Sequence, residues 1–213
     1  MSDTFEELHC DALVAMDISV LDRRTELLRT AARMFAQRGF EATTIRDIGA
    51  AAGLLPGGVC CHFESKDAMV GEILREFLED LFGRYSDIKV SGFDPVETLR
   101  LVLAASFESI FTHHDAVVIY QAEAAQLSAR SAKFAYLDDY ELEFHRNWTE
   151  LLWGGIALGL LRADLDVDMT YKYLRDAVWS AVRWYRPGCG RSPKELSDKY
   201  FQLALHGVGR SHR

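Results

Sequence analysis

Apolar residues in this chain recur at the spacing of an α-helix, and this periodicity is the feature that most restricts its possible folds. The first clear example is a set that falls on one helical face: Leu27, Leu28, Ala31, Met34 and Phe35. No stretch of useful length alternates apolar and polar residues as a half-buried strand would. Only four prolines occur in 213 residues, which suits long helices because proline disrupts a helix interior. The sequence therefore predicts an all-α protein.

Capping residues and glycines divide this pattern into helices. The first helix follows Asp22 and ends at Gly39, the residue type that most often follows a helix. A second, short helix follows Thr44 and ends at Gly53. Thr44 and Asp47 form a T-x-x-D approximation to a capping box at its start. These two helices begin a small N-terminal head.

The remaining helices follow from similar signals. A third short helix is predicted near Pro56, and Ser65 caps a long helix from Lys66 to about residue 88. Later helices are predicted at residues 94–112, 115–129, 132–160, 167–186 and 192–208. We therefore expect a mobile acidic leader at 1–21, a three-helix head at 22–66 and a six-helix body at 67–213.

Charge is distributed unevenly along the chain. The net charge of −8 argues against nucleic-acid binding if it is averaged over all residues. However, residues 23–66 hold seven Lys/Arg against four Asp/Glu, a balance of +3, whereas residues 1–22 hold six acids and no Lys or Arg. Only this middle segment has the sign that phosphate binding requires, although many solvated helical faces carry as much positive charge.

Composition excludes several other classes of protein. No apolar run approaches the roughly 18 residues of a membrane-spanning helix, and residues 1–22 lack the features of a secretion signal. The four cysteines match no zinc-binding spacing. We therefore expect a cytoplasmic protein without a metal or cofactor.

The two short predicted helices meet at a turn that contains glycine, Ala52-Gly53-Leu54-Leu55. This is the layout of a helix-turn-helix, whose second helix enters the DNA major groove. Apolar residues occupy the positions that its small core needs: Phe35, Phe40, Ile45, Ile48, Leu54, Val59 and Phe63. A three-helix packing module without DNA-binding activity would share these features.

The detailed sequence favours DNA binding. The segment RTELLRTAARMFAQRGFEATTIRDIGAAAGLLPGGVCCHFESKDAMV resembles the DNA-binding domain of the TetR family throughout its length. The resemblance implies a transcriptional regulator, most often a repressor, that binds operator DNA as a homodimer and responds to a small effector. It also assigns DNA contacts, either to phosphates or to base edges, to these residues: Thr44, Arg46, Pro56, Gly57, Gly58, Cys60, Cys61, His62 and Lys66.

The expected recognition helix departs from the family pattern. The family usually has a polar residue at Leu55 and tyrosine at Cys60. Gly57 and Gly58 each cost a helix roughly 0.5–1 kcal/mol relative to alanine. A regulator that has lost DNA binding therefore remains an alternative. The run Cys60-Cys61-His62 suggests a metal or redox site, but adjacent helical cysteines point about 100° apart, so small side chains that fill helix positions are favoured.

In the body, Arg175, Trp179 and Arg183 form one stripe at i, i+4 and i+8. The surrounding helix is apolar on more than one side, so we expect the stripe to be buried or at an interface. Its arginines then need anionic partners. Internal acids such as Asp168 or Asp176, or acids of a partner subunit, are one choice. The other is an anionic ligand with a flat ring, such as an acyl-coenzyme A.

Two body segments, FESIFTHHDAVVIYQAEAAQL and ADLDVDMTYKYLRDAVWSAVRWYRPG, are similar to TetR-type repressors of bacterial steroid catabolism. This resemblance implies a coenzyme A thioester from steroid or related ring catabolism as the effector. Tyr120, Gln121 and Glu123 lie on a helix that is expected to border its cavity. Further candidates are Phe107, Phe111, Trp148, Leu152 and Trp153, although aromatics at helical spacing more often belong to a plain core.

An enzyme is the main rival function. The sequence contains no nucleophile elbow, P-loop, dinucleotide fingerprint or paired-carboxylate motif, so we expect no catalytic site. A helical acyl-coenzyme A-binding protein or enzyme that has lost DNA binding is the alternative. The predicted dimer would form through helices 167–186 and 192–208, which hold more apolar residues than one exposed surface needs: Tyr173, Leu174, Val178, Val182, Tyr200, Phe201, Leu203 and Leu205.

Overall fold

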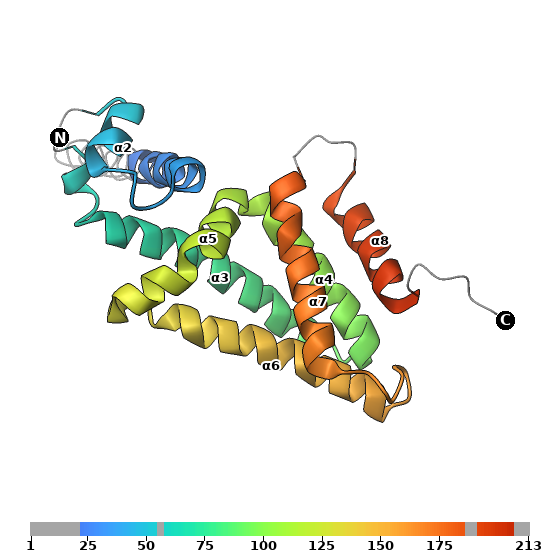
Figure 1. The fold of residues 1–213 in the computed structure, drawn as a ribbon. Helices are drawn as coiled ribbons and strands as arrows, with labels where there is room; N and C mark the ends of the chain where they lie inside the picture. The colour runs from blue at the N-terminus through green and yellow to red at the C-terminus, as the bar shows by residue number, and fades with distance from the viewer. Residues whose placement is uncertain (1–21, 55–57, 186–190, 207–213) are drawn as a thin grey trace, which may run out of the picture. The chain divides into compact units, whose positions relative to one another are not determined.

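Figure 1 presents the chain as a computed structural model, which describes residues 22–54, 58–185 and 191–206. Regular structure in these residues is entirely helical, which confirms the all-α prediction. The chain divides into two compact units, Met1–Ile73 and Leu74–Arg213. The first is called the head unit below and the second the body unit. The predicted leader at 1–21 lies outside the described residues.

The head unit contains the first two helices that the sequence predicts. Residues 22–38 are helical, and Gly39 follows with a φ of 86°, a conformation that glycine adopts without strain. Helix α2 (Ile45–Ala51) is followed by Gly53, whose φ is 67°. The predicted third short helix is the 3₁₀ helix η1 (Val59–Cys61) in its described part, and its predicted start at Pro56 lies outside the described residues. Two glycines before this segment disfavour an α-helix there.

A small apolar core holds the head unit together. The rings of Phe35 and Phe40 lie 5.3 Å apart, and both side chains are buried. Ile48, Val59 and Phe63 are buried as well, as the sequence predicts for this core. Ile45 and Leu54, which the same prediction included, are only half-buried. The core therefore joins the two helices to η1 and to Phe63, which follows it.

An ion pair joins the first helix to the start of α3 (Lys66–Val90). Arg24 Nη2 donates to Glu72 Oε2 at 2.6 Å, and Nη1 contacts the other carboxylate oxygen. The same guanidinium lies over the ring of Phe63, 4.5 Å from its centroid. Hydrogen bonding to Glu72 raises the pKa of Arg24. Because α3 crosses the boundary at Ile73, it belongs to both units.

In its described residues the body unit receives six α-helices, as predicted. They are the later part of α3, α4 (Pro95–Thr112), α5 (His114–Arg130), α6 (Tyr136–Ala157), α7 (Val167–Trp184) and α8 (Pro193–His206). The prediction of one helix over 132–160 is wrong, because the 3₁₀ helix η2 (Ala132–Phe134) precedes α6. Ser131 has an extended backbone, and its side chain accepts a hydrogen bond from the amide of Lys133.

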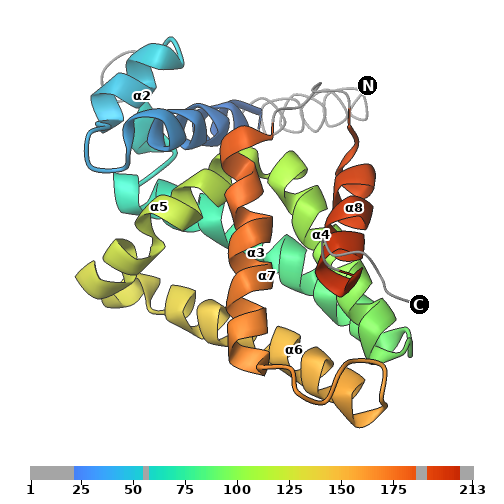
Figure 2. The same ribbon diagram turned by 45° about the vertical axis from the view of Figure 1, so that its right-hand side comes forward.

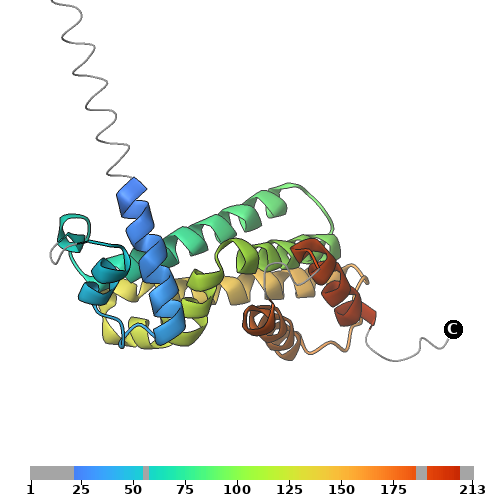
Figure 3. The same ribbon diagram turned by 90° about the horizontal axis from the view of Figure 1, so that it is seen from above.

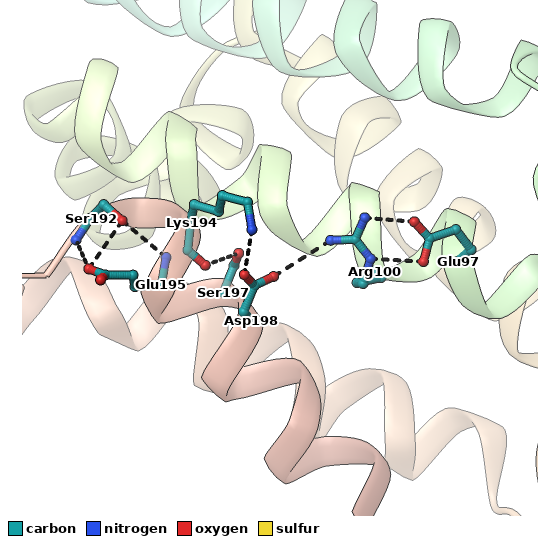
Figure 4. Close-up of polar contacts among 7 residues, drawn as sticks. All are labelled: Glu97, Arg100, Ser192, Lys194, Glu195, Ser197 and Asp198. Atoms are coloured by element: carbon teal, nitrogen blue, oxygen red, sulfur yellow. Dashed lines mark hydrogen bonds and ion pairs between the residues drawn. The ribbon is translucent and has the colours of Figure 1, made fainter.

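Two predicted caps fix where body helices begin. The Asp94 side chain accepts hydrogen bonds from the amides of Val96 and Glu97, and Pro95 occupies the first turn of α4. At α8, the Ser192 and Glu195 side chains each accept from the other residue's amide, at 3.2 and 2.8 Å. Figure 4 shows this cap and the nearby contact between α8 and α4, where Arg100 Nη1 lies 3.6 Å from Asp198.

Helix α4 packs against α6, α7 and α8, while α5 packs against α6 and α7. Figure 2 shows α8 beside α4, and Figure 3 shows α3 turning back into α4. Where α3 meets α4, the Tyr85 hydroxyl lies 2.6 Å from Ser106 Oγ. Burial raises the pKa of this tyrosine. A polar contact therefore lies within the apolar interior and fixes the register of the two helices.

Four aromatic rings connect α3, α5, α6 and α7. The Trp179 ring lies 6.1 Å from Phe77 and 5.8 Å from Phe144, edge-on to both. Tyr120 lies 5.9 Å from Phe77 and 6.3 Å from Phe144. Edge-to-face pairs at these separations are favourable and depend on geometry. We call these four residues the aromatic cluster.

Replacement of Asp94 by alanine should remove the acceptor for two amides at the start of α4. We expect Asp94→Ala to lower the free energy of unfolding by about 1 kcal/mol. Ser86→Ala, an exposed change within α3, should alter stability by no more than about 0.5 kcal/mol. Urea denaturation followed by circular dichroism measures both, and equal stability of the two variants would contradict the role of this cap.

Candidate nucleic-acid interface and ligand cavity

The start of α2 is the best-defined part of the predicted DNA-contacting surface. The Thr44 hydroxyl accepts a hydrogen bond from the Asp47 amide at 3.1 Å, and Asp47 Oδ2 accepts from the Thr44 amide at 3.0 Å. The hydrogen bonds from Thr44 lower the pKa of the Asp47 carboxyl, as do Arg38 and Arg46 nearby. The predicted capping box is therefore confirmed, and it leaves the Arg46 side chain exposed beside it.

The other predicted contact residues follow α2. Cys60 and Cys61 in η1 are exposed, whereas Gly58 and His62 are half-buried. Pro56 and Gly57 lie outside the described residues. In the part of the chain that the structure describes, no group of three or more His, Cys, Asp or Glu residues could hold a metal ion.

Lys66, the last predicted DNA contact, is engaged within the head unit. Its ammonium donates to the Phe40 carbonyl oxygen at 2.7 Å. The same ammonium lies 4.1 Å from the centroid of the Phe40 ring. Lys66 therefore stabilises the turn after the first helix, a role that the sequence did not reveal because Phe40 lies 26 residues away.

The body unit contains a cavity of about 430 Å³ between α5, α6 and α7. Four of the five predicted ligand-binding residues line it: Tyr120, Gln121, Arg175 and Trp179. Asp176, which the sequence analysis names as an internal partner for the stripe arginines, lines it as well. Sequence reasoning missed the remaining lining residues, which are Ala124, Ala125, Leu137, Asp138 and Glu141. The lining residues from α6 belong to no sequence motif, so only the packing of the three helices could reveal them.

Arg175 already has internal anionic partners in this cavity. Its Nη1 donates to Glu141 Oε1 at 2.6 Å, and its Nε donates to Asp176 Oδ1 at 2.9 Å. The Tyr120 hydroxyl donates to the other oxygen of Glu141 at 3.3 Å. Burial opposes ionisation of Arg175, but its hydrogen bonds and the nearby acids raise its pKa overall. Burial, together with Glu141, likewise raises the pKa of Tyr120.

The cavity lining as a whole is acidic. Asp138, Glu141 and Asp176 face a single guanidinium, that of Arg175. The Asp138 carboxylate also accepts a hydrogen bond from Ser128. Phosphate groups are therefore disfavoured inside this cavity, because three carboxylates would repel them.

Arg183 is not part of this cavity. It lies at the C-terminal end of α7, and its side chain is exposed in the single chain, whereas the sequence predicts a stripe that is buried or at an interface. Its place at an interface stays a prediction. Trp179 is 3% exposed, whereas its stripe neighbour Arg183 is open to solvent. Helix α7 lines the cavity at Arg175, Asp176 and Trp179, and its last turn, which carries Arg183, does not line it.

Several aromatic candidates also lie elsewhere. Phe107, Trp148 and Leu152 are buried in the core, and none of them lines this cavity. Phe111 and Trp153 are 40% and 60% exposed, and they do not line this cavity. Glu123 does not line it either.

Comparison with known proteins identifies both units. Residues 27–73 match the family described as "Bacterial regulatory proteins, tetR family". Residues 92–208 match a family described as "Tetracyclin repressor-like, C-terminal domain", which spans more than half of the chain. The chain belongs to the TetR family. The helix-turn-helix predicted from the sequence is therefore the DNA-binding part of a bacterial regulator.

Within the TetR family, the chain is similar to repressors named KstR2. The chain is 46% identical over 190 residues to the transcriptional repressor KstR2 of Rhodococcus jostii, covering 89% of this chain and 93% of that protein. A solved structure of the ketosteroid transcriptional regulator KstR2 of Mycobacterium tuberculosis has a TM-score of 0.84 and 46% identity. It covers 89% of this chain and 96% of the other. The similarity to TetR-type repressors of steroid catabolism is therefore confirmed.

No helix in the described ranges is long and apolar enough to cross a membrane. The structure also contains no β-strand in these ranges.

The position of Arg46 generates a prediction about DNA. Because its guanidinium is exposed on α2 next to the capping box, we expect it to contact operator DNA. Arg46→Ala should weaken operator binding and reduce the slope of log K against log salt by about one unit if it contacts a phosphate. Fluorescence anisotropy at several salt concentrations measures this slope.

Arg146 is an exposed arginine on α6, so Arg146→Ala is the matched control and should leave the slope unchanged. Binding by Arg46→Ala with the wild-type affinity and slope would remove this residue from the interface.

Proposed function

We propose that this TetR-family protein is a homodimeric repressor that releases its operator when a coenzyme A thioester with a ring-derived acyl group binds the body unit. The observation that carries the proposal is the cavity between α5, α6 and α7, where Arg175 and Trp179 lie side by side on one helix face. Its support is the 46% identity to proteins named KstR2 repressors, one of them described as a ketosteroid regulator.

The dimer is assigned to α7 and α8. Large apolar side chains on these helices are exposed to solvent: Met169, Tyr173, Trp184, Leu203 and Leu205. Exposure of several such residues on two adjacent helices is typical of a protein–protein interface. A two-fold axis through this surface would present two heads to successive major grooves.

The charges in the body unit suggest that the acyl group and the phosphates of one thioester would contact different parts of it. An acyl group suits the cavity, whose floor includes Trp179 and Leu137, whereas its three carboxylates oppose phosphates. Arg183 lies about 12 Å further along α7 and is exposed, so it can bind phosphates bidentately. A structure of the regulator AibR with isovaleryl coenzyme A and operator DNA has the same fold, with a TM-score of 0.72 at 22% identity.

The aromatic cluster offers a route from the ligand to the head. Trp179 lines the cavity and contacts Phe77 on α3, which continues without a break to Lys66 in the head unit. A ligand that displaces Trp179 would therefore shift α3. A differential affinity of about 1–3 kcal/mol between the two states would change operator affinity by about 5–150-fold.

Replacement of Arg183 by methionine tests the phosphate assignment. We expect the wild-type protein to release a fluorescent operator when thioesters with branched, monocyclic and bicyclic acyl groups are added, but not with the free acids. Arg183→Met should bind the operator normally and require at least tenfold more thioester. Arg146→Met, a change to another exposed arginine, should respond like the wild type.

Two outcomes would contradict the proposal. One is release by free acids as effective as release by thioesters. The other is thioester binding without any specific operator binding, which would instead support an acyl-coenzyme A-binding protein that has lost DNA binding.

The internal ion pair generates a second prediction. Glu141 accepts a hydrogen bond from the Arg175 guanidinium and adds negative charge to the cavity. Glu141→Gln should therefore strengthen thioester binding severalfold, because the neutral amide competes less for Arg175 and repels the ligand less. Glu143→Gln, on the same helix but paired with Arg146, should have no effect. Calorimetry measures both, and weaker binding by Glu141→Gln would show that this carboxylate contacts the ligand favourably.

A further inference from the structure

Two adjacent cysteines lie in the segment of the head unit that follows α2. Cys60 and Cys61 belong to η1, and both side chains are exposed to solvent. Cysteine is among the residue types that are most often buried, so packing in a core does not explain an exposed pair. Neither residue lines the cavity between α5, α6 and α7. The chemistry of these thiols is therefore separate from ligand binding in the body unit.

The cysteines project from a turn that is anchored on its other side. Val59 and Phe63, which flank the pair, are 2% and 4% exposed and belong to the core of the head unit. The amides of His62 and Phe63 both donate to the Val59 carbonyl oxygen, each at 3.0 Å. Because these contacts hold the backbone of the turn, the two thiols stay on its outer side.

Close packing brings the same turn against α2. A Cβ atom at Gly49 would lie 3.1 Å from Val59 Cγ2, so glycine at this position lets η1 approach the helix. Arg46, which we expect to contact DNA, lies about one turn earlier on this helix. A group attached to either thiol would therefore lie beside the helix that carries Arg46, within the unit to which all the predicted DNA contacts belong.

The charge of this segment favours anionic reagents. Residues 23–66 hold seven Lys/Arg and four Asp/Glu, although the whole chain has a net charge of −8. Small cysteine-containing peptides such as glutathione are negatively charged at neutral pH, and so are their disulfides. A positive surface raises the local concentration of such anions. Once attached to the protein, the same negative group would repel the phosphates of DNA.

We propose that Cys60 and Cys61 are a site of reversible modification by anionic low-molecular-weight disulfides, and that the modified head unit releases its operator. This inference rests on the proposed function, because it requires operator binding by the reduced protein. It differs from the effector response in that it needs neither the cavity nor a movement of α3. The pair would make the regulator sensitive to oxidation as well as to a ligand.

The reaction is a thiol–disulfide exchange. One of the two cysteines loses its proton to solvent, and its thiolate attacks a sulfur atom of the reagent. A bond forms between these two sulfur atoms, while the bond between the two reagent sulfurs breaks. The leaving sulfur takes the electron pair and then a proton, so half of the reagent is released as a thiol. The cysteine is thereby oxidised to a mixed disulfide, and an added dithiol reverses the exchange.

Glutathione disulfide is the probe, and fluorescence anisotropy with a labelled operator measures the response of the full chain. We expect the reagent to weaken operator binding by at least about tenfold, because like charges brought together across an interface oppose association. Dithiothreitol should restore the original affinity. Peptide mass spectrometry should locate the glutathione on the peptide that contains Cys60 and Cys61. Saturating operator should slow this modification, because bound DNA would cover the pair.

Each variant is compared with itself before and after treatment, because the pair is also among the predicted DNA contacts. The double variant Cys60→Ser/Cys61→Ser should have one operator affinity, with or without glutathione disulfide. Cys189→Ser removes a cysteine from the body unit, so it is the matched control and should respond like the wild type. If the double variant binds no operator, the site of the adduct in the wild-type protein and its protection by the operator test the inference instead.

Thermal melting of the modified protein shows whether it remains folded, and unfolding caused by the adduct would overturn the inference. It would also be overturned if the pair stays unmodified, or if the double variant responds like the wild type. Unchanged operator binding by protein that is fully modified at the pair would overturn this inference alone. Absence of operator binding by the reduced wild-type protein would overturn the proposed function as well, so the two failures are distinguishable.

Discussion

Packing of the Trp179 indole against Phe77 and Phe144 is the interaction on which the organisation of the body unit most depends. These rings belong to α7, α3 and α6, and Tyr120 adds α5 to the same cluster. Edge-to-face geometry makes the contacts sensitive to the position of each ring. The indole also forms part of a cavity wall, so the core and the candidate ligand site share one side chain.

Acidic groups around that cavity restrict what it can accept. The sequence predicts a stripe whose arginines pair either with internal acids or with an anionic ligand, and Arg175 pairs with the internal acids Glu141 and Asp176. In the proposed function, an apolar acyl group would lie inside the cavity and the phosphates of the thioester would lie beside Arg183, at the exposed end of α7. The ion pair between α6 and α7 would also have to rearrange when a ligand approaches Arg175. The charge of the lining therefore affects both selectivity and the movement that binding requires.

Local signals in the sequence predicted most of the fold. Thr44 with Asp47, and Ser192 with Glu195, are close in the chain, so their capping geometry follows from residue type and spacing. Non-local contacts were harder to predict. Glu141 lies 34 residues from Arg175, and its role depends on how α6 packs against α7. The exposure of Arg183 depends on where the cavity ends along α7, which helical periodicity does not specify.

We propose that ligand binding in the body unit and operator binding by the head unit are coupled through α3. Thermodynamic coupling is reciprocal, so the operator must weaken ligand binding by the same factor by which the ligand weakens operator binding. The most direct measurement is calorimetric titration of one active thioester into the free protein and into the operator complex. We expect a dissociation constant that is higher for the operator complex than for the free protein, by about 5–150-fold. Equal dissociation constants in the two titrations would contradict it.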